Sequence, residues 1–81
     1  MRKEVVLITG ANGEIGHGLI THLAAQGNYE VIALDVQTLD DALKPLCLKF
    51  IQGDILDTML LGRLVVEYEI RTIYHLASIL S

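Results

Sequence analysis

The chain has 81 residues, of which 52% are hydrophobic, and its formal net charge at pH 7 is −4. This length is enough for one small domain, the scarcity of basic residues argues against nucleic-acid binding, and no apolar run approaches the roughly 20 residues of a membrane span. Cys47 is the single cysteine, so an internal disulfide and a cysteine-based metal site are excluded, and we expect a cytoplasmic protein.

The first predicted element is a strand over residues 5–8, and a glycine-rich turn follows it. Its sequence, VVLI, is apolar without alternation, as is typical of a strand buried on both faces of a parallel sheet. Thr9 ends the strand, and Gly10, Gly13 and Gly16 then recur at every third position. In such a turn the first glycine permits the sharp bend, the second lets the backbone approach a phosphate group, and the third lets the following helix pack close to the strand.

The helix after this turn is predicted over residues 14–26. An apolar stripe at helical spacing, expected to face the sheet, contains Ile15, Leu19, Ile20, Leu23 and Ala24. Gly27 and Asn28 supply the left-handed conformation that ends a helix. Because the first turn of a helix has unpaired N–H groups and the positive end of the helix dipole, the start of this helix is a candidate site for an anion.

The second strand is predicted over residues 31–34 and ends at Asp35, nineteen residues after Gly16. Strand, spaced glycines, helix, strand and terminal acid in this order are the pattern of a dinucleotide-binding unit, in which the acid accepts hydrogen bonds from the adenosine ribose. A carboxylate there repels a 2′-phosphate, and neither residues 11–12 nor residues 36–37 contain an arginine to bind one. The whole pattern therefore predicts NAD rather than NADP, whereas a glycine-rich turn alone is also found in ordinary loops.

The second half of the chain begins with an irregular stretch over residues 37–48. A short third strand is predicted over residues 49–52, and the turn Gly53-Asp54-Ile55 closes it. Asp57 is a predicted cap of a second helix. The apolar positions of this helix, at helical spacing, are Leu61, Leu64, Val65 and Tyr68. A fourth strand is predicted over residues 72–75.

These elements predict an α/β fold, namely the N-terminal part of a Rossmann-type doubly wound parallel sheet with the strand order 3-2-1-4. A ligand is expected at the carboxyl ends of the first and fourth strands, where the glycine-rich turn and residues 75–78 meet. The fourth strand would be a bare hydrophobic edge, which invites pairing with another strand. We therefore expect residues 1–81 to be the N-terminal portion of an incomplete NAD-binding domain. The alternative is an intact small domain that covers this edge in an oligomer.

Four motifs resemble those of the extended short-chain dehydrogenase/reductase family, in its NAD-dependent epimerase/dehydratase group. They are TGANGEIG at residues 9–16, the acid Asp35, GDI at residues 53–55 and HLA at residues 75–77. Together they span nearly all of this chain, which corresponds to a small part of a typical family member. The resemblance implies NAD as the cofactor and a small molecule as the substrate.

The resemblance also implies which residues hold the cofactor. They are Gly10, Asn12, Gly13, Glu14, Ile15, Gly16, Asp35, Val36, Asp54, Ile55, Leu76, Ala77 and Ser78. In this assignment the glycine-rich turn and the first helical amides hold the pyrophosphate, Asp35 binds the adenosine ribose, and Asp54 with Ile55 flanks the adenine. The backbone of residues 76–78 lines the cofactor towards the nicotinamide ribose. Asp54 is also explained as a simple turn residue, and His75 as a structural rather than a catalytic residue.

Two departures from the sugar-nucleotide enzymes of the family concern the substrate. Glu14 stands where those epimerases usually carry phenylalanine, and Ser78 where they usually carry alanine or glycine. The combination looks more like the L-threonine 3-dehydrogenase branch, in which the serine at the end of this segment, here Ser81, helps to bind the amino-acid substrate. The resemblance thus implies a homodimer that oxidises a 3-hydroxy amino acid such as L-threonine, with a nucleotide-sugar epimerase or dehydratase as the alternative.

The chemistry of the family is performed by a Tyr-x-x-x-Lys pair, which this chain lacks. Neither Tyr29 nor Tyr74 has a lysine four residues later, and Tyr68 has Thr72 there. We therefore assign no catalytic residue and expect the chain alone to bind NAD weakly and to catalyse nothing. Two other functions remain open: a non-catalytic NAD sensor, and an S-adenosylmethionine methyltransferase, although the latter usually carries an acidic residue where this chain has Thr9.

Overall fold

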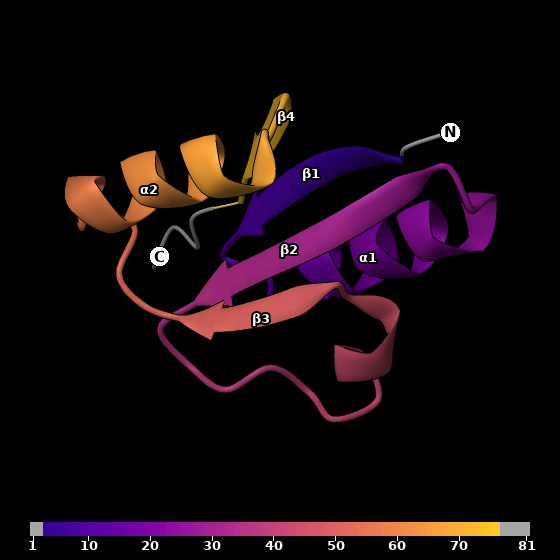
Figure 1. The fold of residues 1–81 in the computed structure, drawn as a ribbon. Helices are drawn as coiled ribbons and strands as arrows, with labels where there is room; N and C mark the ends of the chain where they lie inside the picture. The colour runs from indigo at the N-terminus through magenta and orange to yellow at the C-terminus, as the bar shows by residue number, and fades with distance from the viewer. Residues whose placement is uncertain (1–2, 77–81) are drawn as a thin grey trace.

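A four-stranded parallel sheet in the order β3-β2-β1-β4 is the centre of the computed structural model, which describes residues 3–76. This is the strand order that the sequence predicts. Helix α1 covers one face of the sheet and helix α2 lies on the other (Figure 1). The elements in chain order are β1 (Glu4–Thr9), α1 (Glu14–Gln26), β2 (Tyr29–Asp35), the short 3₁₀ helix η1 (Lys44–Leu46), β3 (Lys49–Gln52), α2 (Thr58–Tyr68) and β4 (Thr72–His75).

The central strands β1 and β2 are buried on both faces, because each face of the sheet has its own hydrophobic core. The core on the α1 side contains Val6, Ile8, Ala11, Ile20, Leu23, Val31, Ala33, Leu39 and Leu43. The core on the α2 side contains Leu7, Ile32, Leu34, Leu64 and Ile70. Successive side chains of a strand point to opposite faces, so the unbroken apolar runs of β1 and β2 supply both cores at once.

Helix α1 ends at Gly27, whose φ of 74° is left-handed, as predicted. The prediction that Ile15 faces the sheet is wrong, because this side chain is 73% exposed. Ile20 and Leu23 of the predicted stripe are buried, together with Gly16, and Ile15 lies about 100° around the helix axis from Gly16. The apolar pattern thus placed most of the buried face correctly and failed at Ile15, because Gly16, which has no side chain, faces the core beside it.

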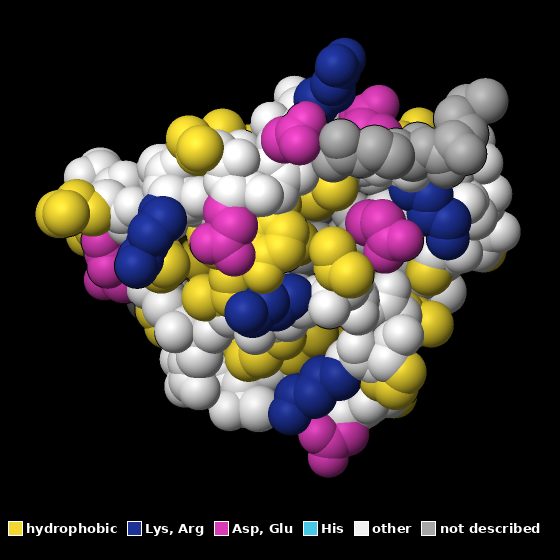
Figure 2. All heavy atoms as spheres, viewed as in Figure 1, with side chains coloured by type: hydrophobic (Ala, Val, Ile, Leu, Met, Phe, Trp, Pro, Cys, Tyr) yellow, Lys and Arg dark blue, Asp and Glu magenta, His cyan; other side chains and the backbone are white. Residues whose placement is uncertain are grey.

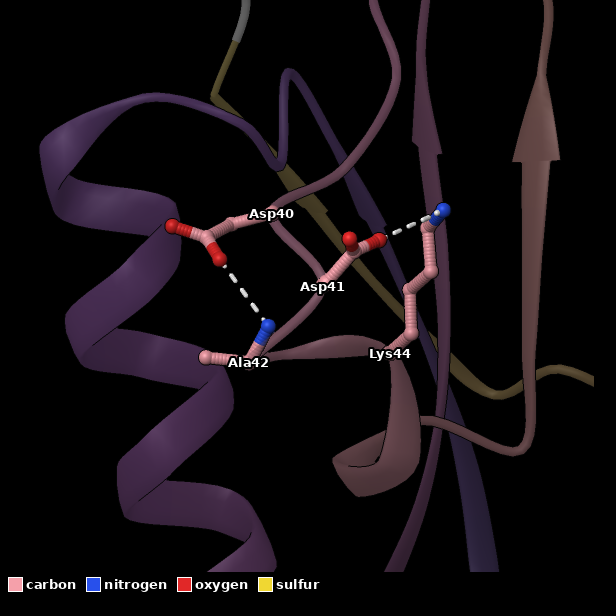
Figure 3. Close-up of polar contacts among 4 residues, drawn as sticks. All are labelled: Asp40, Asp41, Ala42 and Lys44. Carbon is pink, nitrogen blue, oxygen red and sulfur yellow. Dashed lines mark hydrogen bonds and ion pairs between the residues drawn. The ribbon is translucent and has the colours of Figure 1, made fainter.

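The connection between β2 and β3 closes the core on the α1 side. Asp40 forms a turn in which its Oδ1 accepts a hydrogen bond from the backbone N–H of Ala42 at 2.9 Å, and Lys44 Nζ pairs with Asp41 Oδ1 at 3.1 Å (Figure 3). The turn leads into η1, so the irregular stretch that the sequence predicts contains a single turn of 3₁₀ helix. The buried side chains of this connection are Leu39 and Leu43.

Helix α2 packs one side on the sheet and carries apolar residues on the other side as well. Asp57 Oδ1 accepts a hydrogen bond from the backbone N–H of Leu60 at 3.1 Å, which confirms the predicted cap. The predicted apolar positions lie in the core on the α2 side or pack against it: Leu61, Leu64, Val65 and Tyr68. On the outer side, Met59 and Val66 are 83% and 79% exposed. Figure 2 shows hydrophobic side chains over this helix, in the upper left of the view, beside acidic and basic ones.

Gly62 lies in the exposed part of α2 at a position where the fold does not require a glycine. A Cβ there would meet no atom within 4 Å, and its φ is not among the positive values found at Gly10 and Gly27. We expect Gly62→Ala to raise the free energy of unfolding by about 0.5–1 kcal/mol, because alanine has the higher helix propensity. Urea unfolding of the protein expressed from its complete reading frame measures this change.

Gly27→Ala is the matched control for this substitution. Its Cβ would also meet no atom within 4 Å, but its φ of 74° disfavours a side chain, so the control should lose stability. A loss of stability in Gly62→Ala as well would contradict the prediction.

Candidate functional site

The carboxyl ends of the strands lie at one edge of the sheet and bring most of the predicted site residues together. In the strand register Thr9 of β1 lies opposite Leu34 of β2 and His75 of β4. Asp35 at the end of β2 lies opposite Gln52 of β3. The glycine-rich turn, the acid that ends β2 and the turn after β3 therefore meet at this edge.

The glycine-rich turn is bound to the end of β2. Gly10 has a φ of 68°, as expected for the sharp bend, and the N–H groups of Gly10 and Ala11 both donate to the carbonyl oxygen of Leu34, at 2.9 and 3.3 Å. Gly16 lies against the turn, since a Cβ there would be only 2.2 Å from the carbonyl oxygen of Ala11. The close packing predicted for this glycine is confirmed, with the backbone of the turn rather than the strand as its nearest partner.

The first turn of α1 is open to a ligand. Its N-cap is Gly13, which has no side chain to cap the helix. The N–H groups of Glu14 and Ile15 have no carbonyl four residues earlier in the helix. A Cβ on Gly13 would meet no atom closer than the carbonyl oxygen of Gly10, at 3.7 Å. The residue Glu14 is exposed, so its charge can stay in solvent. The space and the positive end of the helix dipole fit a phosphate group.

The Asp35 carboxylate links the end of β2 to the glycine-rich turn. Its Oδ2 accepts a hydrogen bond from the backbone N–H of Asn12 at 2.9 Å, and its Oδ1 accepts one from the backbone N–H of Gln37 at 2.9 Å. Each carboxylate oxygen has room for a second hydrogen bond. Two neighbouring hydroxyl groups, such as those of a ribose, match this pair of acceptors.

Two glutamines that the sequence analysis did not select complete the hydrogen bonds around Asp35. Gln52 Nε2 donates to the carbonyl oxygen of Val36 at 3.0 Å, and Asn12 Nδ2 donates to Gln37 Oε1 at 3.5 Å. Val36 itself is 60% exposed. Gln52 could have been selected from the predicted strand order, because that order places the end of the third strand beside the end of the second.

The turn after β3 contains Asp54 and Ile55, the two residues that are predicted to contact adenine. Asp54 Oδ1 accepts a hydrogen bond from the backbone N–H of Leu56 at 2.9 Å, and the Asp54 carbonyl oxygen accepts one from Asp57 N–H at 2.9 Å. Asp54 therefore forms a turn, as one of the two interpretations of the sequence has it, and Ile55 beside it is half-buried. The contact of both residues with adenine stays a prediction.

The end of β4 is joined to the end of β1. The backbone N–H of Leu76 donates to the carbonyl oxygen of Thr9 at 2.9 Å, and Thr9 Oγ1 lies in hydrogen-bond contact with His75 Nδ1 at 3.0 Å. This contact supports a structural role for His75. The predicted residues Ala77, Ser78 and Ser81 lie outside the described residues.

Metal binding, a membrane-spanning helix and a reactive thiol find no support in the part of the chain that the structure describes. Residues 3–76 contain no group of three or more His, Cys, Asp or Glu placed to hold a metal ion, and none of their helices is long and apolar enough to cross a membrane. Cys47 precedes β3, at the opposite edge of the sheet, and burial raises the pKa of its thiol above the ordinary value. A raised pKa disfavours the nucleophilic thiolate.

A family model matches nearly the whole chain. Residues 6–81 match the NAD dependent epimerase/dehydratase family. The chain belongs to this family. The resemblance carried by the glycine-rich turn, the acid after β2 and the later motifs is therefore confirmed.

Individual relatives include enzymes of both branches that the sequence points to. The chain is 33% identical to a UDP-glucose 4-epimerase of Pasteurella multocida (strain Pm70), over 91% of this chain and 24% of the relative. Among solved structures, L-threonine dehydrogenase from Clostridium difficile is 32% identical with a TM-score of 0.76, over 100% of this chain and 26% of that one. UDP-glucose 4-epimerase from Brucella ovis in complex with NAD is 29% identical with a TM-score of 0.81, over 96% and 24%. The chain thus spans about a quarter of the length of these relatives.

Proposed function

We propose that this chain provides the adenosine and pyrophosphate half of an NAD site in an NAD-dependent oxidoreductase. The observation that carries the proposal is the Asp35 carboxylate, which Asn12 N–H holds beside the open first turn of α1. The carboxylate would accept hydrogen bonds from the adenosine ribose, and the N–H groups of Glu14 and Ile15 would face the pyrophosphate. The NAD dependence of the family and the NAD in the Brucella ovis structure support this assignment.

The other predicted residues extend this site in two directions. Asp54 and Ile55 would flank the adenine, and Leu76 would line the cofactor towards the nicotinamide ribose. Bound NAD would supply the acceptor for a hydride. The residues of this chain would bind and orient the cofactor, and we assign proton transfer to none of them.

For the complete protein we favour oxidation of a 3-hydroxy amino acid such as L-threonine. Glu14 and the segment at residues 75–81 support this choice, together with the likeness to the Clostridium difficile L-threonine dehydrogenase over the whole chain. Nucleotide-sugar epimerisation is the second candidate, and the Pasteurella multocida epimerase supports it at similar identity. We expect the complete protein to act as a cytoplasmic homodimer.

Calorimetric titration of the protein expressed from its complete reading frame tests the cofactor. We expect binding of NAD, weaker binding of NADP, and no binding of S-adenosylmethionine. Formation of NADH with L-threonine, compared with epimerisation of UDP-glucose, then separates the two substrate classes. Binding of S-adenosylmethionine without NAD would refute the proposal, and NAD binding without turnover of either substrate would favour an NAD sensor.

A further inference from the structure

We infer that Gln52 is a positioning residue for the Asp35 carboxylate and acts through the peptide group between Val36 and Gln37. The inference rests on the proposed NAD function. It adds to that function a residue from a different strand, one that controls how the carboxylate meets the adenosine ribose.

A single peptide group connects the two side chains. Its carbonyl oxygen, on Val36, accepts a hydrogen bond from Gln52 Nε2 at 3.0 Å, and its N–H, on Gln37, donates to Asp35 Oδ1 at 2.9 Å. The peptide plane is therefore held at both ends, between an amide donor and a carboxylate acceptor. Hydrogen bonds arranged in such a chain polarise and strengthen one another.

Loss of the Gln52 amide would release one end of this peptide group. The turn lies at the surface, with Val36 60% exposed, so packing does little to hold the peptide plane there. Rotation of the plane would move the Gln37 N–H away from Oδ1 and bring a carbonyl oxygen nearer to the carboxylate. Asp35 would keep the hydrogen bond from Asn12 to Oδ2, but the orientation of its second oxygen would no longer be fixed.

The place of Gln52 in the fold makes this role separable from stability. Gln52 ends β3 opposite Asp35 in the strand register, and it is exposed. It therefore contributes little to either hydrophobic core. A change at this position is expected to affect the geometry of the carboxylate much more than the folding of the sheet.

The test is Gln52→Met in the protein expressed from its complete reading frame. Methionine has a similar length and no N–H donor. We expect the affinity for NAD to fall by roughly two- to tenfold, the net effect of one hydrogen bond. Gln26→Met is the matched control, because Gln26 is exposed near the end of α1 and its amide bonds His22 Nε2 at 2.7 Å. The control should bind NAD as the unmodified protein does.

Titration with 2′-deoxy-NAD separates positioning of the carboxylate from a general loss of structure. The unmodified protein should bind NAD more tightly than 2′-deoxy-NAD, and Gln52→Met should reduce this difference. An unchanged affinity for NAD, or an equal loss for the two ligands, would overturn the inference while leaving the proposed function intact. Absence of NAD binding by the unmodified protein would reject the proposed function, and the inference with it.

Discussion

Replacement of Gly16 by alanine is expected to lower the free energy of unfolding by about 3 kcal/mol, at the upper end of the usual cost of overpacking. The new Cβ would lie 2.2 Å from the carbonyl oxygen of Ala11, and 2.7 and 2.9 Å from the carbonyl carbon and Cα of that residue. Ala11 is completely buried. Because the clash is with backbone, no rotation of a side chain relieves it, and α1 must move away from the glycine-rich turn.

Gly13→Ala, in the same turn, is the control for this prediction. Its Cβ would meet only the carbonyl oxygen of Gly10, at 3.7 Å, so the free energy of unfolding should change little. The affinity for NAD should fall if a phosphate group occupies this space. Urea unfolding and calorimetric titration of both variants, made in the protein expressed from its complete reading frame, measure the two effects. Similar stability of the two variants would show that the contact between Gly16 and Ala11 is not tight in solution.

Asp35→Ala is expected to reduce the affinity for NAD by at least about 100-fold and to relax the discrimination against NADP. Each hydrogen bond to a charged group contributes about 1.5–3 kcal/mol, and the carboxylate is proposed to accept two from the ribose. The substitution also removes the acceptor for the N–H groups of Asn12 and Gln37. NADP gains in relative terms, because the negative charge that would repel its 2′-phosphate is gone.

Glu30→Ala is the control for the change in charge. Glu30 lies near the amino-terminal end of the same strand, away from the site, and pairs with Lys3 at 3.8 Å. Titration of both variants with NAD and NADP, in the protein expressed from its complete reading frame, distinguishes a local role of Asp35 from an effect of net charge. If the ratio of the two affinities stays unchanged in Asp35→Ala, the assignment of this carboxylate to the ribose is wrong.

The elements of this fold follow from patterns that are local in the sequence. The apolar runs at residues 5–8 and 31–34 predict the central strands, and the structure extends them to Glu4–Thr9 and Tyr29–Asp35. The extension arises because the flanking residues also pair across the sheet, as Glu4 does with Tyr29, although their side chains do not continue the apolar pattern. Pairing of backbone groups is not visible in side-chain hydrophobicity.

The candidate site was predictable where the conformation or charge of one residue suffices. Gly10 and Asp35 are such residues, since a positive φ and a terminal acid can each be read from a motif. Gln52 is not, because its role depends on a peptide group that belongs to another strand end. The exposure of Ile15 was mispredicted for a related reason, because it depends on how α1 is rotated against the turn, where Gly16 lies close to the backbone of Ala11.

The contacts at the two sides of the site differ in how far apart their residues lie along the chain. Asp35 and Asn12 are separated by 23 residues, and Gln52 and Val36 by 16, whereas Thr9 and His75 are separated by 66. Short loops cost less entropy to close, and local contacts form sooner than distant ones. The adenosine side would therefore take shape early in folding, and the predicted nicotinamide side only when β4 joins β1. A cofactor held first by its adenosine end would then stabilise the partly folded chain before β4 has enclosed the reactive end of the cofactor.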